Sequence, residues 1–284
     1  MNRRSFAALV AAVVAAALAT AGSSARTTAV PHRIVSLSPT ATESLYAIGA
    51  DKQVIAVDDQ SDYPKRAPRT KLSGFTPNVE AIASYRPDLV VLAYDTGGVV
   101  ASLRKLKVRV LVQPAATGLP DAYAQILELG GVTGHAKKAK AVVAGMKRKI
   151  ARIVAAAPRR RTVAVYHELS PDLYSATSKT FIGRIYTLFG LHNIADAADS
   201  TASGYPKLSN EYVVASNPGL IVLADTTCCG QSLATVSARP GWSGVAAVRN
   251  RAIVRVDDSI ASRWGPRVVD FTRAVGSALR TTAR

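Results

Sequence analysis

NVEAIASYRPDLVVLA at 78–93 and SNEYVVASNPGLIVLA at 209–224 are two versions of one phrase. Each runs from a glutamate, Glu80 or Glu211, through a helix-like half to a proline seven residues later, and then into an apolar, strand-like half. The glutamates and the prolines recur at the same offset along the chain. A repeat of a helix and a strand in the same order predicts two similar α/β lobes rather than one large domain. Two lobes enclose a cleft, in which a ligand can bind.

The composition agrees with two lobes and excludes general disorder. The chain has 284 residues, 48% of them hydrophobic and 19% charged, which is enough for one or two cores of about 100–150 residues each. Its 36 Lys and Arg against 19 Asp and Glu give a net charge of +17. The basic residues are dispersed, and their densest clusters, at 137–149 and 159–161, carry few aromatic residues. We therefore expect no nucleic-acid partner; a solvated basic surface and anionic surroundings, such as wall polymers, remain as explanations.

The first 25 residues are typical of a secretory signal peptide. Arg3 and Arg4 precede an uncharged, Ala-rich stretch at 6–21, and the small residues at 22–25 offer a cleavage site after Ala25. An apolar run of about 16 residues is short for a membrane span, which needs about 20. The mature protein is therefore expected to be exported and soluble, in the periplasm or at the cell surface. Whether the paired arginines direct general or twin-arginine export is left open.

A helical segment lies between the repeats. A short helix at 121–129 is predicted to stop at Gly130-Gly131, and 135–157 is predicted to form one amphipathic helix that ends at Pro158. At 1.5 Å per residue this second helix is about 35 Å long, so it crosses a whole lobe as a rigid strut. The chain therefore divides into a signal peptide (1–25), an N-terminal α/β lobe (33–120), connecting helices (121–158) and a C-terminal α/β lobe (159–284).

Each lobe alternates strand-like and helix-like segments, which predicts a mostly parallel sheet covered by helices. The predicted strands are 33–37, 53–57, 88–93 and 108–112 in the first lobe and 162–166, 193–194, 220–224 and 252–256 in the second. In open parallel sheets ligands bind beyond the carboxyl ends of the strands. The candidates for the cleft are therefore the residues that follow the strands: Ser38-Pro39-Thr40, Asp58-Asp59-Gln60, Tyr94-Asp95, His167-Glu168, Thr226-Thr227-Cys228-Cys229 and Asp257-Asp258.

Four motifs in this order resemble a known family. RIVSLSPTATESLYAIGA at 33–50, SDYP at 61–64, the Glu80 helix with RPDLVVL, and SRWGPR at 262–267 are similar to the cobalamin- and iron-siderophore-binding proteins of ABC importers, and most similar to the cobalamin branch. The resemblance covers residues 33–280. It implies two Rossmann-like lobes joined by one long, rigid α-helix, which is the class III solute-binding architecture. It also implies a monomer that binds a small molecule between the lobes, delivers it to a membrane permease, and has neither catalysis nor a cofactor.

The resemblance assigns Glu80 and Glu211 to docking, because the family places one surface carboxylate on each lobe against arginines of the two permease subunits. Two carboxylates on similar lobes suit a partner with two-fold symmetry. A structural role remains as the alternative. Both glutamates are predicted to lie in the first turn of a helix, where the helix dipole favours acidic residues.

The resemblance also implies the ligand contacts. Tyr174, Tyr205 and Arg263 fall where cobalamin binders place two aromatics and an arginine, whereas Phe75 and Tyr94 stand near the family's tryptophans. Gln60 replaces a tyrosine. The full set of expected ligand-binding residues is Ser38, Pro39, Thr40, Asp59, Gln60, Phe75, Tyr94, Tyr174, Tyr205 and Arg263. Because flat macrocycles bind through broad aromatic walls, the smaller aromatic area leaves a changed ligand open. As alternatives, the tyrosines pack in the lobe, and Arg263 caps a helix or pairs with Asp258.

Two further features depart from the family's pattern. Cys228 and Cys229 are the only cysteines, and export favours their oxidation to a vicinal disulfide, which marks a tight turn. Free thiols and a contact with the ligand are the alternatives, and no metal site is expected, because two adjacent thiols are a poor zinc pattern. Four acids could accept hydrogen bonds from the amide groups of a corrinoid, or serve as turn residues: Asp58, Asp59, Asp257 and Asp258.

Other functions have less support in the sequence. His167-Glu168 lacks the second histidine of a zinc hydrolase helix, and neither a Gly-x-Ser-x-Gly elbow nor a Gly-rich phosphate loop occurs. A Cys229–His167 nucleophile pair is the remaining enzymatic option for a secreted protein. Within the family, a ferric siderophore would suit the basic balance, and haem would need His167 as the axial ligand. The sequence thus predicts an extracytoplasmic binding protein for cobalamin or a related corrinoid, with ferric siderophore or haem as alternatives.

Overall fold

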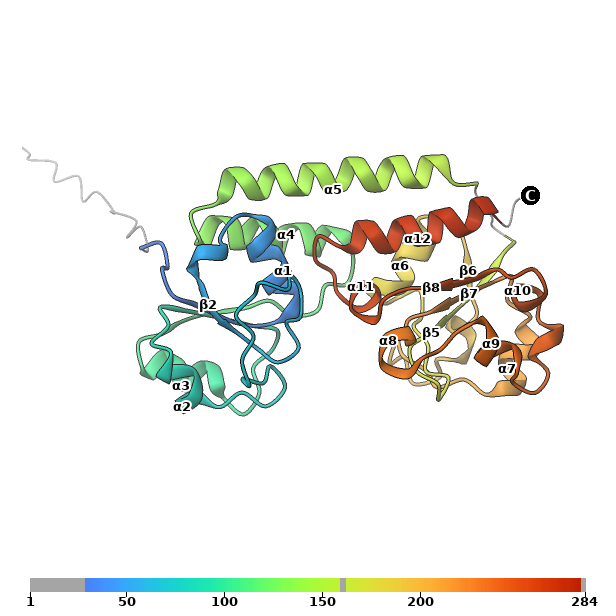
Figure 1. Cartoon of the computed structure of the whole chain (residues 1–284), viewed down its shortest axis with the longest axis horizontal. Coiled ribbons are helices and arrows are strands. Elements are labelled where there is room, and N and C mark those ends of the chain that lie inside the picture. The colour runs from blue at the N-terminus through green and yellow to red at the C-terminus, as the bar shows by residue number, and fades with distance from the viewer. Residues whose placement is uncertain (1–28, 159–161, 282–284) are drawn as a thin grey trace, which may run out of the picture.

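The computed structural model describes residues 29–158 and 162–281 (Figure 1). The expected signal peptide at 1–25 and the basic cluster at 159–161 lie outside these residues. Within the described part of the chain, no helix is both long and apolar enough to cross a membrane.

The N-terminal lobe contains a four-stranded parallel sheet in the order β2-β1-β3-β4. The central strands β1 and β3 are buried along their whole length and are apolar except for Ser36, as expected of parallel strands whose two faces are both covered by helices. Its elements are β1 (Ile34–Leu37), α1 (Pro39–Ala47), a 3₁₀ turn (Asp51–Gln53), β2 (Val54–Val57), α2 (Val79–Ser84), β3 (Leu89–Leu92), α3 (Val99–Lys105) and β4 (Arg109–Val112).

The C-terminal lobe repeats this topology, with a parallel sheet in the order β6-β5-β7-β8. The repeat in the sequence is therefore confirmed as two equivalent sheets. Its strands and major helices are β5 (Ala164–Glu168), α6 (Phe181–Thr187), β6 (His192–Asn193), α7 (Asn210–Ser216), β7 (Leu220–Leu223), β8 (Ile253–Arg255) and α12 (Val268–Thr281). Short helices fill the connections: Asp196–Ala198, α8 (Thr226–Cys229), α9 (Leu233–Ser237), Trp242–Gly244, α10 (Ala246–Arg249) and α11 (Asp258–Ser262).

The strand β5 differs from the prediction of 162–166. It extends to Glu168, because residues 165–168 pair in register with residues 220–223 of β7. His167 and Glu168 therefore lie inside the sheet rather than after it, and both are fully buried.

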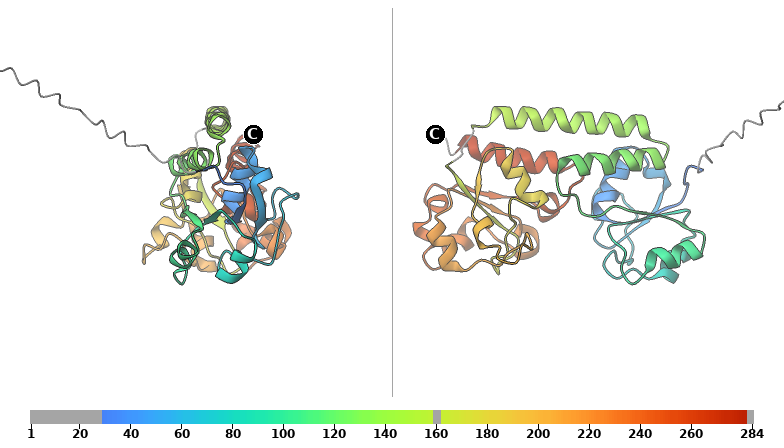
Figure 2. Two further views of the ribbon diagram at one scale, coloured as in Figure 1. Left: turned by 90° about the vertical axis from the view of Figure 1, so that its left-hand side faces the viewer. Right: turned by 180° about the vertical axis from the view of Figure 1, so that it is seen from behind.

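Two long helices connect the lobes, α4 (Leu119–Val132) and α5 (Ala136–Ala156). Figures 1 and 2 show α5 running across both lobes, above α4 on one side and α12 on the other, and α5 packs against both. Its 21 residues make it about 32 Å long. The expected strut thus exists, with ends within one residue of the prediction.

The prediction that Gly130-Gly131 stops the first connecting helix is wrong, because α4 continues to Val132. Gly130 serves a different purpose: a Cβ atom there would lie 2.3 Å from Cβ of Ala139 on α5. The missing side chain lets the two helices approach each other closely. A helix with a regular apolar period is easily misread as interrupted where it contains a glycine at its crossing with another helix.

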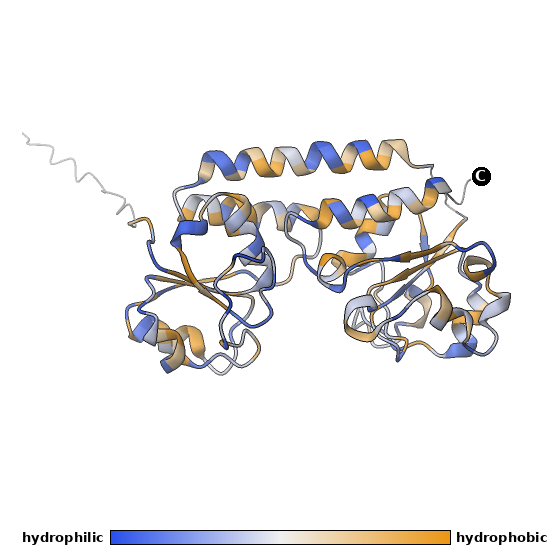
Figure 3. Cartoon of the chain, viewed as in Figure 1, coloured by the Kyte–Doolittle hydropathy of each residue, from blue (hydrophilic) through white to orange (hydrophobic). Residues whose placement is uncertain are grey.

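The hydrophobic core follows from this arrangement. One large cluster extends from the N-terminal sheet through the buried stripe of α5 to α12 and the C-terminal sheet, and a smaller cluster covers the far face of each sheet. Figure 3 shows the apolar strands inside the lobes and the alternation of apolar and polar residues along α5. Since a single core spans both lobes and the helix between them, we expect the lobes to move little relative to each other.

Candidate functional site

A cavity of about 460 Å³ lies between the lobes at the carboxyl ends of the strands. The N-terminal lobe contributes the residues that follow β1, β2 and β3, and the C-terminal lobe contributes α11 and the segment after it. The structure brings seven of the ten predicted ligand-binding residues together in this lining: Ser38, Pro39, Thr40, Gln60, Phe75, Tyr94 and Arg263. The remaining lining residues are Leu37, Asp58, Gly74, Ala93, Asp258, Ser259, Ser262 and Trp264.

The N-terminal wall of the cavity presents two aromatic rings. Phe75 is 65% exposed and Tyr94 is 42% exposed, which is unusual for such large apolar side chains and indicates a surface that a ligand could cover. Gly74 allows this arrangement, because a Cβ atom at this position would lie 2.7 Å from the carbonyl oxygen of Leu37. The hydroxyl of Ser38 caps α1 by accepting from Ala41 N, so that side chain already has a structural partner.

Three predicted ligand residues lie outside this cavity. Asp59 is exposed next to it, and its backbone N–H donates to Leu72. Tyr174 and Tyr205 are 44% and 48% exposed on the C-terminal lobe. The backbones of Tyr174 and Lys207 form an isolated antiparallel β-bridge, and Nζ of Lys207 lies 5.7 Å from the centre of the Tyr174 ring. Neither tyrosine packs in the core, so both remain available to a ligand larger than the cavity.

Asp58 is the buried acid of the cavity wall. Its side chain is 1% exposed, and Oδ1 has no hydrogen-bond partner in the described structure. Burial raises the pKa of this carboxyl group to about 6; the Asp59 charge acts in the same direction, whereas a hydrogen bond from Ser61 and the charge of Arg263 oppose it. Near neutral pH the carboxyl group at this wall of the cavity is therefore mostly ionised.

The stability of the protein should report this burial. The unfolded chain releases the proton of Asp58 near pH 3.8 and the folded chain near pH 6, so its contribution to the free energy of unfolding falls as the pH rises between these values. Asp58→Asn should remove this loss. Its free energy of unfolding relative to wild type should therefore rise by about 2 kcal/mol as the pH goes from 4 to 7. Urea denaturation at several pH values measures the difference. An offset that does not change with pH would show that Asp58 is not the titrating group.

The two lobes are joined at the cavity by a buried ion-pair network. Glu43 on α1 is 3% exposed and accepts from Arg263 Nη1 at 3.0 Å and from Arg267 at 2.6 and 3.0 Å. Arg263 also donates to Asp62 Oδ1 at 2.7 Å and to the carbonyl oxygen of Gln60 at 2.8 Å. The alternative pairing of Arg263 with Asp258 is therefore wrong. Arg263 lines the cavity, but its charge is neutralised by carboxylates of the other lobe.

Trp264 is a cavity residue that sequence reasoning did not select. Its Nε1 donates to Gln125 Oε1 at 2.8 Å, and its ring packs edge-on against Phe181. It thereby connects α4 with both the cavity and the C-terminal lobe. The SRWGPR motif at 262–267 contains this tryptophan, but the pattern gave no indication that Trp264 lines the cavity together with Arg263.

The acidic residues of the C-terminal wall have defined partners. Asp257 caps α11 by accepting from Ile260 N at 3.1 Å, as its turn-residue alternative supposed. Asp258 lines the cavity and accepts from the backbone N–H groups of Thr227 at 3.0 Å and Cys228 at 2.8 Å. Cys228 and Cys229 form a disulfide. Within residues 29–158 and 162–281, no group of three or more His, Cys, Asp or Glu residues is arranged to hold a metal ion.

His167 cannot serve as the haem ligand or the general base that the sequence left open. It is fully buried in β5, its Nδ1 lies 2.5 Å from the hydroxyl of Tyr186, and Phe271 packs against its ring. Burial lowers the pKa of His167 to about 3. Since Cys229 is exposed and joined in a disulfide, the two residues do not form a nucleophile pair.

Glu80 and Glu211 occupy equivalent places on the two lobes. Each lies exposed in the first turn of a short helix, α2 behind the cap Asn78 and α7 behind the cap Ser209. Neither forms an ion pair with a residue of the described chain. Figure 1 shows α2 and α7 at the bottom of their lobes, on the side of the molecule away from α5.

Comparison with known proteins agrees with this architecture. The model of the periplasmic binding protein family matches residues 34–260. A cobalamin-binding protein of Halobacterium salinarum is 33% identical, covering 89% of this chain and 70% of its own length. An uncharacterised ABC transporter substrate-binding lipoprotein of Bacillus subtilis is 31% identical, covering 88% and 80%. The periplasmic heme-binding protein of Roseiflexus has the same fold, with a TM-score of 0.76 over 89% of this chain and 99% of its own, at 23% identity. The chain therefore belongs to the periplasmic binding protein family.

Proposed function

We propose that this protein is the extracytoplasmic substrate-binding component of an ABC importer. It captures cobalamin or a related corrinoid in the cleft between its lobes and delivers it, as a monomer, to the permease. The family assignment supports the binding role. A relative that is named as cobalamin-binding and is 33% identical over most of the chain supports the choice of ligand.

The charge of the cavity is the observation that carries this choice. Although the chain as a whole has a net charge of +17, the charged residues in the cavity lining are Asp58, Asp258 and Arg263. Arg263 is held by two carboxylates, so no unpaired cation of the described residues lines the cavity. An anionic ferric chelate would meet carboxylates here, whereas the neutral amide groups of a corrinoid can donate to Asp58 and exchange hydrogen bonds with the hydroxyl of Thr40.

A corrinoid is larger than the cavity and should extend across the cleft. Phe75 and Tyr94 then cover one face of the ligand, and we assign the exposed rings of Tyr174 and Tyr205 on the other lobe to contacts with its edge. Exposed aromatic rings contribute the apolar contact area from which such ligands gain most of their affinity.

Haem is the second candidate, because one cavity residue offers an oxygen ligand for iron. Tyr94 is exposed in the lining, and a structural relative is named as heme-binding. Two observations disfavour haem. None of the four histidines lines the cavity, and the carboxylate groups of haem, like an anionic siderophore, would find no unpaired cation in the described lining.

Delivery is assigned to Glu80 and Glu211. Two exposed carboxylates without partners in the described chain, one on each lobe and both on helices at the same side of the molecule, suit a permease with two symmetry-related basic surfaces. In this arrangement the basic helix α5 points away from the permease.

Titration calorimetry against cyanocobalamin, haemin and ferrichrome in parallel tests the proposal. We expect saturable one-to-one binding of cyanocobalamin, and binding at least 100-fold weaker for ferrichrome. Preferential binding of haemin or of the ferric chelate would contradict the choice of a corrinoid while leaving the transport role intact. Chemical conversion of any of the three by the protein would contradict the binding role itself.

A further inference from the structure

The disulfide follows a strand at the edge of the sheet that carries the cavity, and it is connected to the cavity lining through Asp258, although neither cysteine lines the cavity itself. α8, which contains Cys228 and Cys229, begins directly after β7, and α11 begins directly after the adjacent parallel strand β8. Both helices therefore start from the same edge of the sheet, the edge that carries the cavity, and they pack against each other. Figure 1 shows α8 and α11 on the side of the C-terminal lobe that faces the N-terminal lobe.

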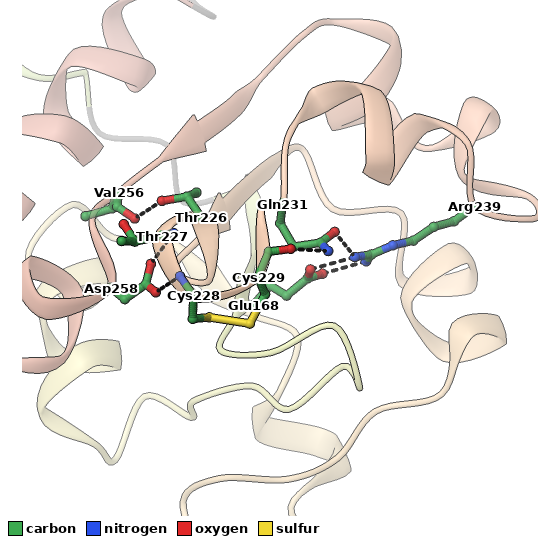
Figure 4. Close-up of a disulfide and its surroundings, with 9 residues drawn as sticks. All are labelled: Glu168, Thr226, Thr227, Cys228, Cys229, Gln231, Arg239, Val256 and Asp258. Carbon is green, nitrogen blue, oxygen red and sulfur yellow. Dashed lines mark hydrogen bonds and ion pairs between the residues drawn. A yellow bond between two sulfur atoms is a disulfide. The ribbon is translucent and has the colours of Figure 1, made fainter.

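Asp258 connects the disulfide directly to the cavity wall. It lines the cavity, and its carboxylate accepts from the backbone N–H groups of Thr227 at 3.0 Å and of Cys228 at 2.8 Å (Figure 4). The hydroxyl of Thr226 donates to the carbonyl oxygen of Val256 at 3.0 Å. These bonds fix the start of α8 against the segment that leads into the cavity wall.

A second set of contacts holds the other end of α8. Glu168 is fully buried and accepts from both terminal nitrogens of Arg239 at 2.6 and 2.7 Å. Arg239 also donates to Gln231 Oε1 at 2.8 Å, and Gln231 Nε2 donates to the carbonyl oxygen of Cys229 at 3.4 Å. Figure 4 shows the disulfide between the two sets of bonds, with Asp258 on one side and Glu168 and Arg239 on the other. The sulfur pair is therefore held in a fixed place.

The disulfide has no evident role as a cross-link. It joins neighbouring residues, whereas the stabilisation by a disulfide through chain entropy grows with the length of the loop that it closes. Both cysteines are exposed, so their sulfur atoms do not fill a gap in the core. A rigid, exposed and apolar sulfur pair connected to the wall of a binding cleft instead has the properties of a contact surface.

We propose that the Cys228–Cys229 disulfide is part of the ligand-binding surface. It forms a fixed sulfur face on the C-terminal wall of the cleft, across from the exposed rings of Phe75 and Tyr94, and takes a ligand with a broad apolar or π-electron face. Polarisable sulfur makes favourable contacts with such faces. The sulfur face thereby compensates in part for the reduced aromatic area of this chain. This inference deepens the proposed function and rests on its binding role.

The test measures the binding of cyanocobalamin by wild type and by a double variant that carries both Cys228→Ser and Cys229→Ser. Serine keeps the size and the backbone of each residue but removes the sulfur face. We expect the dissociation constant to rise about tenfold with an unchanged circular dichroism spectrum. Thr227→Ala is the matched control, because it removes an exposed side chain of the same helix and leaves the backbone bond to Asp258; its dissociation constant should change less than twofold.

A second readout separates contact from a structural role. Bound ligand should slow the reduction of the disulfide by dithiothreitol at least fivefold, as measured by alkylation with iodoacetamide and mass spectrometry. Protection without any loss of affinity in the double variant would mean that closure of the cleft merely covers the sulfurs, and would overturn the inference. So would a loss of affinity without protection, which would reflect a disturbed α8.

The test also distinguishes this inference from the choice of ligand. If wild type binds haemin or ferrichrome and not cyanocobalamin, the corrinoid proposal fails, and the same variants are compared with the ligand that binds. An unchanged dissociation constant in the double variant then overturns the inference as well. Absence of binding by wild type to all three ligands would overturn both.

Discussion

Replacing both Glu80 and Glu211 by arginine is expected to abolish uptake of the ligand through the permease while leaving the affinity of the purified protein unchanged. Each carboxylate lies exposed at the start of a helix, on α2 and α7, and neither belongs to the cavity lining. Charge reversal replaces attraction to a basic surface by repulsion on both lobes at once. Cell uptake of labelled cobalamin and calorimetry of the purified variants measure the two effects separately, and we expect at least a 100-fold loss in uptake alone.

The control for docking reverses two acids on the opposite side. Glu128 on α4 and Asp270 on α12 are exposed, and their replacement by arginine changes the net charge by the same amount. Glu128 loses a part-buried hydrogen bond from Gln113, and Asp270 loses its exposed pair with Arg273; each loss should cost about 2 kcal/mol or less. Normal uptake by this control is expected. Equal losses of uptake in both double variants would indicate a general effect of charge, and a parallel loss of ligand affinity would remove the docking assignment.

Replacing Glu43 by alanine is expected to lower the free energy of unfolding by about 3 kcal/mol, because it leaves two largely buried arginines without their shared carboxylate. The side chain of Glu43 is 1% exposed, and those of Arg263 and Arg267 are 12% and 15% exposed. The network also joins α1 of one lobe to the segment before α12 of the other. Ligand affinity should therefore fall together with stability, since the two cavity walls lose their fixed relation.

Asp62→Asn provides the comparison within the same network. Asp62 also binds Arg263, but its side chain is 39% exposed, so solvent screens the pair and its loss should cost about 1 kcal/mol or less. Urea denaturation of wild type and both variants at pH 7 measures the difference. Equal destabilisation by the two substitutions would mean that burial does not control the strength of this network.

Much of the fold was predictable because it depends on local patterns. Strands such as Leu89–Leu92 and Leu220–Leu223 are short apolar runs behind a proline, and α5 has an uninterrupted amphipathic period, so neighbouring residues carry the signal. The errors occurred where a distant contact overrides the local pattern. Gly130 resembles a helix stop, but it is required by Ala139 of another helix, and His167 resembles a residue after a strand, but β7 extends the pairing past it.

The candidate site divides in the same way. Residues at strand ends, such as Ser38, Gln60 and Tyr94, were predictable, because the carboxyl edge of a parallel sheet collects them regardless of detail. The partners of each side chain and its burial could not be predicted from the sequence. Arg263 lies 220 residues from Glu43 in the sequence, and the two residues meet because the lobes are set against one another by α4, α5 and α12.

The sequence by itself determined that this protein has two similar lobes, a long connecting helix and a cleft between them, since these follow from a repeat and from periodicities within the chain. Only the tertiary structure decided that Arg263 is neutralised, that His167 is buried, and that the carboxylate of Asp258 accepts from the backbone of Cys228. Charge compensation, burial and exposure depend on which distant residues become neighbours, and the packing of the two lobes against the connecting helices sets those neighbours.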